Sequence, residues 1–478
     1  MGSRSKDDPS PRGRGVVDVD PEDLAPMLDD FQAFVQPYLR LFGRTQVREN
    51  AERAIRGMLS DIPRKSAERL AEFNGQPRRA MQRFVGAGPW KDAPFIDRLC
   101  SEVGQEIGLA DGVLIVDPTS FVKKGDDSVG VKRQWCGRLG KTENCQVGVF
   151  LSYASKEGQT LVDYRLYLPE EWADDKARRE ACYVPKEVMF RTSWELADEL
   201  ITNRSASLPH SWVLGDEEFG RVGEFRDRLG ARGERYMLDA PSDVHVRILG
   251  QGARRGRRPD PIPARDWVSE LKDRDWAVFT IRDGTKGPIQ VQAAWTKVAT
   301  NKKPGTKKGD WSREEVLLVV RTLGQQPQTK YLLTNADSKT VPLPVMVQAA
   351  CTRWRIEDCF ERAKGEVGLH HYEVRSWTGW HHHMTLGLIG LWFLTLQHRK
   401  LRKRFPPLHG SAGSLLLRRT PAGPAPARSS RRGSNRQRAA HPQRAVAHPP
   451  LEEREAQARG DADSGWMVSR DDGRHVAQ

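Results

Sequence analysis

The sequence predicts an α/β protein that is preceded by a helical region and interrupted by a β-rich insertion. Apolar residues recur at three- and four-residue steps from Leu24 to Leu39, as in an amphipathic helix. Short apolar runs at 113–116 and 212–215 are typical of strands that are buried on both faces. Between 241 and 342, strand-like pieces are separated by Gly, Pro and basic loops.

These patterns divide the chain into successive regions. We expect a helical N-terminal domain at 21–110, an α/β domain at 111–240 and 343–398, and the β-rich insertion at 241–342. Residues 1–20 are polar, and the basic tail at 399–478 is rich in Pro and Arg, so both are expected to be disordered.

The helical N-terminal region has two open interpretations. Further helices are expected at 47–60, 66–73, 78–85 and 95–107, where Pro and Gly separate the periodic stretches. Arg78, Arg79 and Arg83 share one of them, so the region could bind DNA. It could equally be a plain helical cap on the next domain.

The net charge of +14 comes mostly from the tail. Residues 399–450 contain thirteen Lys/Arg and no Asp/Glu, whereas residues 1–398 contain 60 Lys/Arg and 56 Asp/Glu. A basic surface on the folded part must therefore be local, and the whole-chain charge does not by itself indicate nucleic acid.

Composition also bears on cellular location and on metal or disulfide sites. No apolar run is long enough to cross a bilayer, and the longest, at 386–396, suits a buried helix. Six cysteines without a C-x-x-C pair indicate reduced thiols, and no ligand is spaced suitably beside His381 to His383 for a zinc site. We expect a cytoplasmic protein without a membrane partner.

Two aspartates follow directly after buried apolar runs. Asp117 follows 113–116 and Asp216 follows 212–215. In an α/β sheet ligands bind at the carboxyl ends of the strands, so these side chains are candidate site residues. Asp also initiates turns, which is the ordinary explanation of either one taken alone.

A third carboxylate lies in a stretch that reads as a helix, 353–364. Residues four apart share a helix face, so Arg353 aligns with Glu357, and Lys364 falls two turns further on. An ordinary surface helix with ion pairs is the alternative, and Glu361 is the main rival to Glu357. Together with the two aspartates, Glu357 would complete a set of oxygen ligands suited to two Mg²⁺ or Mn²⁺ ions at a phosphodiester.

Several long motifs resemble the DDE transposases of the insertion sequence 701 family. The resemblance covers roughly residues 25–400. The motifs that carry it are 117–125, 128–137, 139–141, 144–149, 215–220, 353–357, 365–369 and 372–375.

The resemblance implies an RNase H-like fold with the acidic triad Asp117, Asp216 and Glu357. The spacings agree, because 99 and 141 positions separate successive acids and this class places a β-rich insertion in the second gap. The wider class carries a Tyr-Arg-Glu-Lys signature, which Arg353, Glu357 and Lys364 fit. Its tyrosine position is Ala350 here, which weakens any expected tyrosine contact.

Basic residues around these motifs are candidates for the DNA backbone. Arg353 and Lys364 would contact phosphates near the scissile bond. Lys123, Lys124, Lys132 and Arg133 could do the same or could lie in solvated turns. Trp135 could belong to the core or could stack on an unpaired base.

The function implied is that of a cut-and-paste DNA transposase. It would bind the ends of an insertion sequence, cleave DNA with two metal ions, and join the 3′-OH to target DNA. Synapsis of two ends implies a homodimer or larger oligomer in a bacterial, nucleoid-associated setting. The alternatives are an inactive transposase-derived DNA-binding protein with a degenerate C-terminus, and a glycosidase with paired carboxylates that needs no metal.

Overall fold

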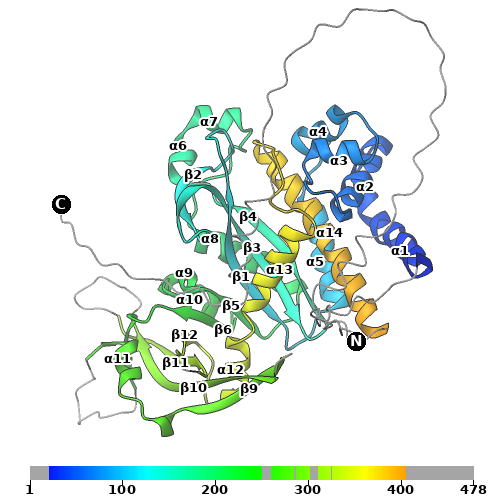
Figure 1. The fold of residues 1–478 in the computed structure, drawn as a ribbon. Helices are drawn as coiled ribbons and strands as arrows, with labels where there is room; N and C mark the ends of the chain where they lie inside the picture. The colour runs from blue at the N-terminus through cyan, green and yellow to red at the C-terminus, as the bar shows by residue number, and fades with distance from the viewer. Residues whose placement is uncertain (1–20, 250–259, 285–286, 302–309, 325, 405–478) are drawn as a thin grey trace, which may run out of the picture.

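The computed structural model describes residues 21–249, 260–284, 287–301, 310–324 and 326–404 (Figure 1). The predictions for residues 1–20 and for the tail beyond Arg404 lie outside these residues.

Five helices occupy the N-terminal region, as the sequence predicts. They are α1 (Pro21–Leu39), α2 (Thr45–Leu59), α3 (Ala67–Phe73), α4 (Arg78–Ala87) and α5 (Ala93–Glu106). Phe31, Val35 and Tyr38 are buried at helical spacing and share a core with Ile389 and Phe393 from a helix near the C-terminal end of the described chain. The helical region is therefore packed against the rest of the protein.

All the strands in the described residues belong to one mixed sheet. The strands are β1 (Val113–Val122), β2 (Lys132–Cys136), β3 (Lys141–Ser155), β4 (Gly158–Leu166), β5 (Trp212–Gly215), β6 (Tyr236–Ala240), β7 (His245–Ile248), β8 (Ile262–Pro263), β9 (Ala277–Gly284), β10 (Gly287–Thr300), β11 (Arg313–Thr322) and β12 (Thr329–Thr334). Their order is β2-β3-β1-β5-β6-β12-β11-β10-β7-β8, with β4 also paired to β3 and β9 to β10.

Short helices connect and cover these strands. They are α6 (Glu170–Asp174), α7 (Lys176–Ala181), α8 (Ser193–Arg204), α9 (Glu217–Gly220), α10 (Gly223–Ala231) and α11 (Ala264–Ser269), with 3₁₀ turns at Ser205–Ser207 and Asp273–Asp275. Three helices follow the last strand: α12 (Leu343–Ala350), α13 (Trp354–Gly365) and α14 (Trp377–Arg404). In Figure 1, α13 and α14 run beside the central strands, and α14 also borders the N-terminal helices.

The centre of the sheet contains its two parallel pairs, β1 with β5 and β5 with β6. All four residues of β5 and residues 113–116 of β1 are buried. Helices α8 and α13 both contact β1 and β3, so these strands are covered and read as continuous apolar runs.

Strand β1 is longer than the sequence predicts. The apolar run ends at Val116, but the strand continues through Asp117 and Pro118 to Val122. Strand β5 ends at Gly215, opposite Val116, so the second half of β1 pairs with β3 alone. Proline has no N–H to donate to a neighbouring strand. It is tolerated there because one side of this half of β1 has no partner strand.

The β-rich segment continues the central sheet. Strand β12 pairs with β6, and the segment's own apolar cluster includes Val246, Trp267 and Leu317. The predicted strands appear with boundaries shifted by a few residues, because the polar ends of β10 and β11 carry no hydrophobic signal but still pair.

The last helix also exceeds its predicted end. We expected the disordered tail to begin at residue 399, but α14 continues to Arg404. Arg399 forms ion pairs with Glu106 and Glu157, and Lys400 with Asp30, which hold this turn against neighbouring elements. Among the described residues, no helix combines the length and apolarity needed to span a bilayer.

A buried ion pair links the β-rich segment to the centre of the protein. Glu315 on β11 lies 3.0 Å from Nε of Arg226 on α10, and both side chains are almost fully buried. Tyr236 on β6 donates to the same carboxylate at 2.5 Å. Three elements therefore converge on one buried charge.

Replacing Glu315 with Gln should destabilise the fold by roughly 3–5 kcal/mol, because Arg226 would remain buried without a counter-charge. Urea unfolding followed by circular dichroism measures the change. Glu314→Gln, at the exposed neighbouring position, should stay within about 0.5 kcal/mol of wild type. Equal stability of the two variants would contradict the prediction.

Candidate active site

Three aspartates form a row at the carboxyl ends of the parallel strands. Val116 of β1 pairs with Gly215 of β5, and Gly215 pairs with Leu238 of β6. An aspartate directly follows each of these three residues in the sequence. We call these three aspartates the aspartate row (Asp117, Asp216 and Asp239). Because the three occupy equivalent positions in adjacent parallel strands, their side chains project from the same face of the sheet.

Close backbone packing holds this row in place. Asp216 caps the short helix α9, where its Oδ1 accepts a hydrogen bond from Glu218 N at 3.0 Å. Gly220 ends α9 against β6, and a Cβ at this position would lie 1.8 Å from the Asp239 carbonyl oxygen. Glycine is therefore required for α9 to pack here.

Arg353 brings a positive charge to the aspartate row. It precedes α13, and its side chain is only 15% exposed. Its Nε lies 3.2 Å from Asp239, and its Nη1 lies 3.7 Å from Asp117. Burial lowers the pKa of the guanidinium, but four nearby carboxylates together raise it further. They belong to Asp239, Asp117, Glu357 and Asp216.

Glu357 faces Arg353 from one turn further along α13. Its Oε1 lies 3.2 Å from Arg353 Nη2, and its side chain is 49% exposed. Glu361 is also exposed, and it has no ion pair with Arg353. The geometry thus links Glu357, and not its rival, electrostatically to the aspartate row.

Burial makes the anionic forms of two aspartates costly. It is the main cause of the raised pKa of Asp117, to which Asp216 and Glu357 add repulsion while Arg353 opposes the shift. Burial likewise raises the pKa of Asp216 to about 7, again against the effect of Arg353. The site therefore carries more negative charge than one guanidinium neutralises.

The donor set is chemically suited to a divalent cation, although the acids do not yet converge. No cluster of three His, Cys, Asp or Glu side chains in the described residues is arranged to hold a metal ion. Arg353 bridges Asp117 and Glu357 instead. Hard carboxylate oxygens with excess negative charge nevertheless fit Mg²⁺ or Mn²⁺.

Two more of the predicted basic residues lie along β1 beyond Asp117. Lys364 Nζ donates to Thr119 Oγ1 at 2.7 Å, two residues beyond Asp117 on β1. Lys123 follows the end of β1, and its Nζ lies 3.5 Å from the centroid of the Tyr372 ring. Burial lowers the pKa of Lys364 to about 8 and that of Lys123 to about 7.

The remaining predicted contacts are less closely tied to the centre. Lys124 is exposed in the loop after β1. Lys132 and Arg133 lie on strand β2 and not in the predicted turn, and Lys132 is paired with Glu171 at 2.9 Å. Trp135 on the same strand is 64% exposed, so it does not belong to the core.

Sequence reasoning missed Asp239. The signal was present, because Asp239 is the third aspartate near the end of a predicted strand. It was not singled out because it lies one position before the end of the run, and only the register shows that it aligns with Asp216.

The cysteines agree with prediction, since all six are free.

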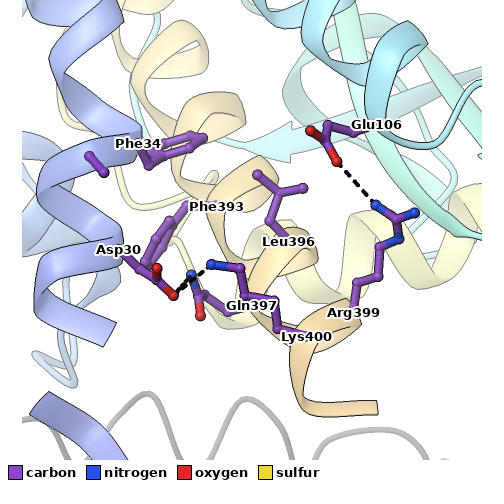
Figure 2. Close-up of a pocket in the computed structure, with 9 residues that line it drawn as sticks. Asp30, Phe34, Glu106, Phe393, Leu396, Gln397, Arg399 and Lys400 are labelled. Carbon is purple, nitrogen blue, oxygen red and sulfur yellow. Dashed lines mark hydrogen bonds and ion pairs between the residues drawn. The ribbon is translucent and has the colours of Figure 1, made fainter. Parts of the chain in front are cut away.

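A separate pocket of about 430 Å³ lies away from the aspartate row (Figure 2). Phe34 on α1 and Phe393 and Leu396 on α14 form its apolar part, and Asp30 with Lys400 lies at its rim. None of the predicted site residues lines it.

Comparison with known proteins assigns the family. A family model described as DDE superfamily endonuclease matches residues 37–288, a range that contains the aspartate row and ends before Glu357. The chain belongs to this family. The resemblance to insertion sequence 701 transposases is confirmed by a curated relative from Microchaete diplosiphon, the probable transposase for insertion sequence element IS701.

The extent of these similarities is limited. The relative is 28% identical over 237 residues, which are 48% of this chain and 59% of that protein. A piggyBac transposase synaptic complex with hairpin DNA is similar with a TM-score of 0.35 and 10% identity, over 83% of this chain and 76% of the other. The NurA nuclease of Sulfolobus solfataricus is similar with a TM-score of 0.25 and 9% identity, over 54% of this chain and 80% of the nuclease. Neither TM-score is high enough to assign a fold.

Replacing Arg353 with Met should destabilise the protein by about 3 kcal/mol at pH 8, because Asp117 would lose its counter-charge and Asp239 would keep only Lys330. The difference in stability between wild type and Arg353→Met should become smaller towards pH 5. Acids with raised pKa values bind more protons in the folded than in the unfolded state, so stability rises as pH falls through those values.

Thermal and urea unfolding of both proteins between pH 8 and pH 5 measures this deficit. Arg221→Met removes an exposed guanidinium that pairs with Glu217 on the surface, and it serves as the control. A deficit for Arg353→Met that does not change with pH would contradict the electrostatic explanation.

Proposed function

We propose that this chain is a DDE transposase. It binds the ends of an insertion sequence, cleaves DNA by metal-dependent hydrolysis, and joins the 3′-OH to target DNA by transesterification. The aspartate row with Arg353, in a member of the DDE superfamily endonucleases, is the observation that carries the proposal. Similarity to a probable insertion sequence transposase supports it.

The proposed architecture is an RNase H-like catalytic domain at 111–240 and 343–398. The antiparallel strands β4, β3 and β1, followed by parallel β5 and β6, support it. The helical domain at 21–110 and the β-rich insertion at 241–342 complete the proposed architecture. The helical domain has two alternative roles, which are DNA binding and a structural cap.

Asp117 and Asp216 are the proposed metal ligands, and Glu357 completes the set. Mg²⁺ or Mn²⁺, as two ions, would supply Lewis acidity at the scissile phosphodiester and lower the pKa of the attacking water or hydroxyl. For Glu357 to join the two aspartates, its ion pair with Arg353 must open. Substrate phosphate is an alternative partner for that guanidinium.

Basic residues around the acids would position the DNA. Arg353 and Lys364 are the proposed contacts nearest the scissile phosphate, and Lys123, Lys124, Lys132 and Arg133 are proposed along the backbone. The partners are transposon ends and target DNA, with a homodimer or larger oligomer in the synaptic complex. We propose a bacterial, nucleoid-associated setting.

The second candidate is an inactive, transposase-derived DNA-binding protein. It is favoured by the ion pair that holds Glu357 against Arg353. It predicts end binding in Ca²⁺ without cleavage in Mg²⁺.

Glu357→Gln should reduce end cleavage by roughly 10³-fold or more, because it removes a charged ligand while keeping the shape of the side chain. Binding of the end should change little. The assay uses a duplex made from the end of the element that encodes this chain, with Mg²⁺ for cleavage and Ca²⁺ for binding.

Glu361→Gln is the matched control, one turn along the same helix, and should cleave like wild type. Equal cleavage by Glu357→Gln and wild type would refute the assigned triad. A wild-type protein that binds but does not cleave would establish the second candidate.

Asp239→Asn should weaken Mn²⁺ binding on the order of tenfold, a size typical of groups that orient metal ligands. Without the negative charge of Asp239, Arg353 would lie closer to Asp117 and would compete with the cation for that carboxylate. Electron paramagnetic resonance of free Mn²⁺ measures the affinity. Asp239→Glu should restore it, and unchanged affinity in Asp239→Asn would contradict the role.

A further inference from the structure

Helices α2, α3 and α4 of the N-terminal region form a compact unit. The three helices contact one another, and their shared core includes Ile55, Leu70 and Phe84. Gly57 on α2 lies so close to α3 that a Cβ at this position would be 2.6 Å from Leu70 Cδ2. Such close packing holds the three helices in a fixed arrangement.

A short turn at residues 74–77 joins α3 to α4. Gly75 in this turn has a φ of +62°, in the left-handed region that favours glycine. Asn74 accepts a hydrogen bond from Arg56 Nη2 at 2.9 Å and donates to the Arg53 carbonyl at 3.1 Å. Both arginines belong to α2, so this helix fixes the turn and the direction in which α4 leaves it.

This arrangement has the features of a helix-turn-helix. In that motif a turn of three or four residues, often with a glycine, joins two helices. The second helix lies in the major groove of DNA, with its N-terminal residues at the base edges. Helix α4 has the position of that second helix. Figure 1 shows α3 and α4 at the outer end of the N-terminal region, away from the β-rich segment.

The first half of α4 exposes four polar side chains, which are Arg78, Arg79, Gln82 and Arg83. Arg78 is paired with Glu68 at 2.8 Å. Within the described residues, Arg79, Gln82 and Arg83 form no side-chain hydrogen bond or ion pair. Arg79 and Arg83 are four positions apart on one helix face, where like charges repel. An anionic partner would remove that repulsion.

The chemistry of this face suits duplex DNA better than an acidic protein. An arginine can contact O6 and N7 of guanine together, and a glutamine can contact N6 and N7 of adenine. Arg79, Gln82 and Arg83 therefore include both of these side-chain types on one exposed face. An acidic protein surface would match the two arginines, but it would account neither for Gln82 nor for the helix-turn-helix geometry.

We propose that α4 is a recognition helix, which reads the sequence of duplex DNA in the major groove through Arg79, Gln82 and Arg83. The buried side of α4 packs against α14. DNA binding and the structural cap then belong to opposite faces of one helix and do not exclude each other. That the DNA is the end of an insertion sequence rests on the proposed function, whereas the sequence-reading surface does not.

Binding of the full chain to two duplexes tests the proposal. One duplex carries the end of the element that encodes this chain, and the other contains the same bases in shuffled order. Fluorescence anisotropy in Ca²⁺, at about 150 mM salt to weaken non-specific binding, gives both Kd values. Arg79→Ala and Arg83→Ala should each raise Kd for the end about tenfold and should raise Kd for the shuffled duplex much less.

Two control variants separate base reading from charge and from folding. Arg83→Lys keeps the positive charge but loses the bidentate geometry, so it should also lose preference for the end. Arg265→Ala on α11 removes an exposed arginine in the β-rich segment and should leave both Kd values unchanged. Because the substituted side chains are exposed, thermal unfolding of all variants should resemble that of wild type.

A base analogue identifies the groove. 7-Deazaguanine lacks the N7 acceptor that an arginine contacts in the major groove. Its use in place of guanine in the end duplex should weaken binding of wild type several-fold. It should have little effect on a double variant with Arg79→Ala and Arg83→Ala. Equal weakening of the two proteins would place the contact elsewhere and overturn the proposal.

Other results would also overturn the recognition helix. An equal loss of affinity for both duplexes in Arg79→Ala and Arg83→Ala would leave only backbone contacts for these side chains. Unchanged affinity for both duplexes would reject any contact. Polyglutamate that competes as well as the end duplex at the same charge concentration would point to an acidic protein partner instead.

These outcomes are separable from those of the proposed function, because binding in Ca²⁺ needs no cleavage. Loss of end preference in the α4 variants of a protein that never cleaves in Mg²⁺ would support the recognition helix and reject the enzyme. Cleavage in Mg²⁺ by a protein whose α4 variants keep the wild-type preference would retain the enzyme and reject the recognition helix. A wild type without preference for the end would reject the recognition helix, and cleavage would still decide the enzyme.

Discussion

The charge balance between Arg353 and the carboxylates around it is the interaction on which the site depends. Sheet register places the aspartate row on one edge, where burial makes the negative charges of Asp117 and Asp216 costly. The guanidinium lies against this row and also reaches Glu357 on its own helix. One cation thus fixes where α13 meets the sheet, and it holds together groups that repel one another.

This arrangement also explains why remote parts of the chain matter to the site. Lys330 on β12 lies 3.8 Å from Asp239, so the β-rich segment contributes charge to the aspartate row. Strand β12 pairs with β6, and the buried pair of Arg226 with Glu315 anchors the next strand, β11. The edge of the aspartate row is therefore stabilised from the β-rich side of the sheet.

Much of the fold could be predicted because buried elements carry strong hydrophobic patterns. The runs before Asp117 and Asp216 marked the central strands, and the spacing of Arg353 and Glu357 marked the helix that faces them. Asp239 escaped prediction because its alignment depends on strand register, which no local pattern encodes.

The early end of β5 has a consequence for how a ligand could enter. Beyond Val116 and Gly215 the sheet divides, because β1 continues with β3 while the chain after β5 turns into α9. The side of β1 that faces this division has no ladder hydrogen bonds to lose, and Pro118 has no N–H to leave unsatisfied. A ligand that binds the acids from this side would therefore leave every strand pair intact, so its binding need not lower the stability of the sheet.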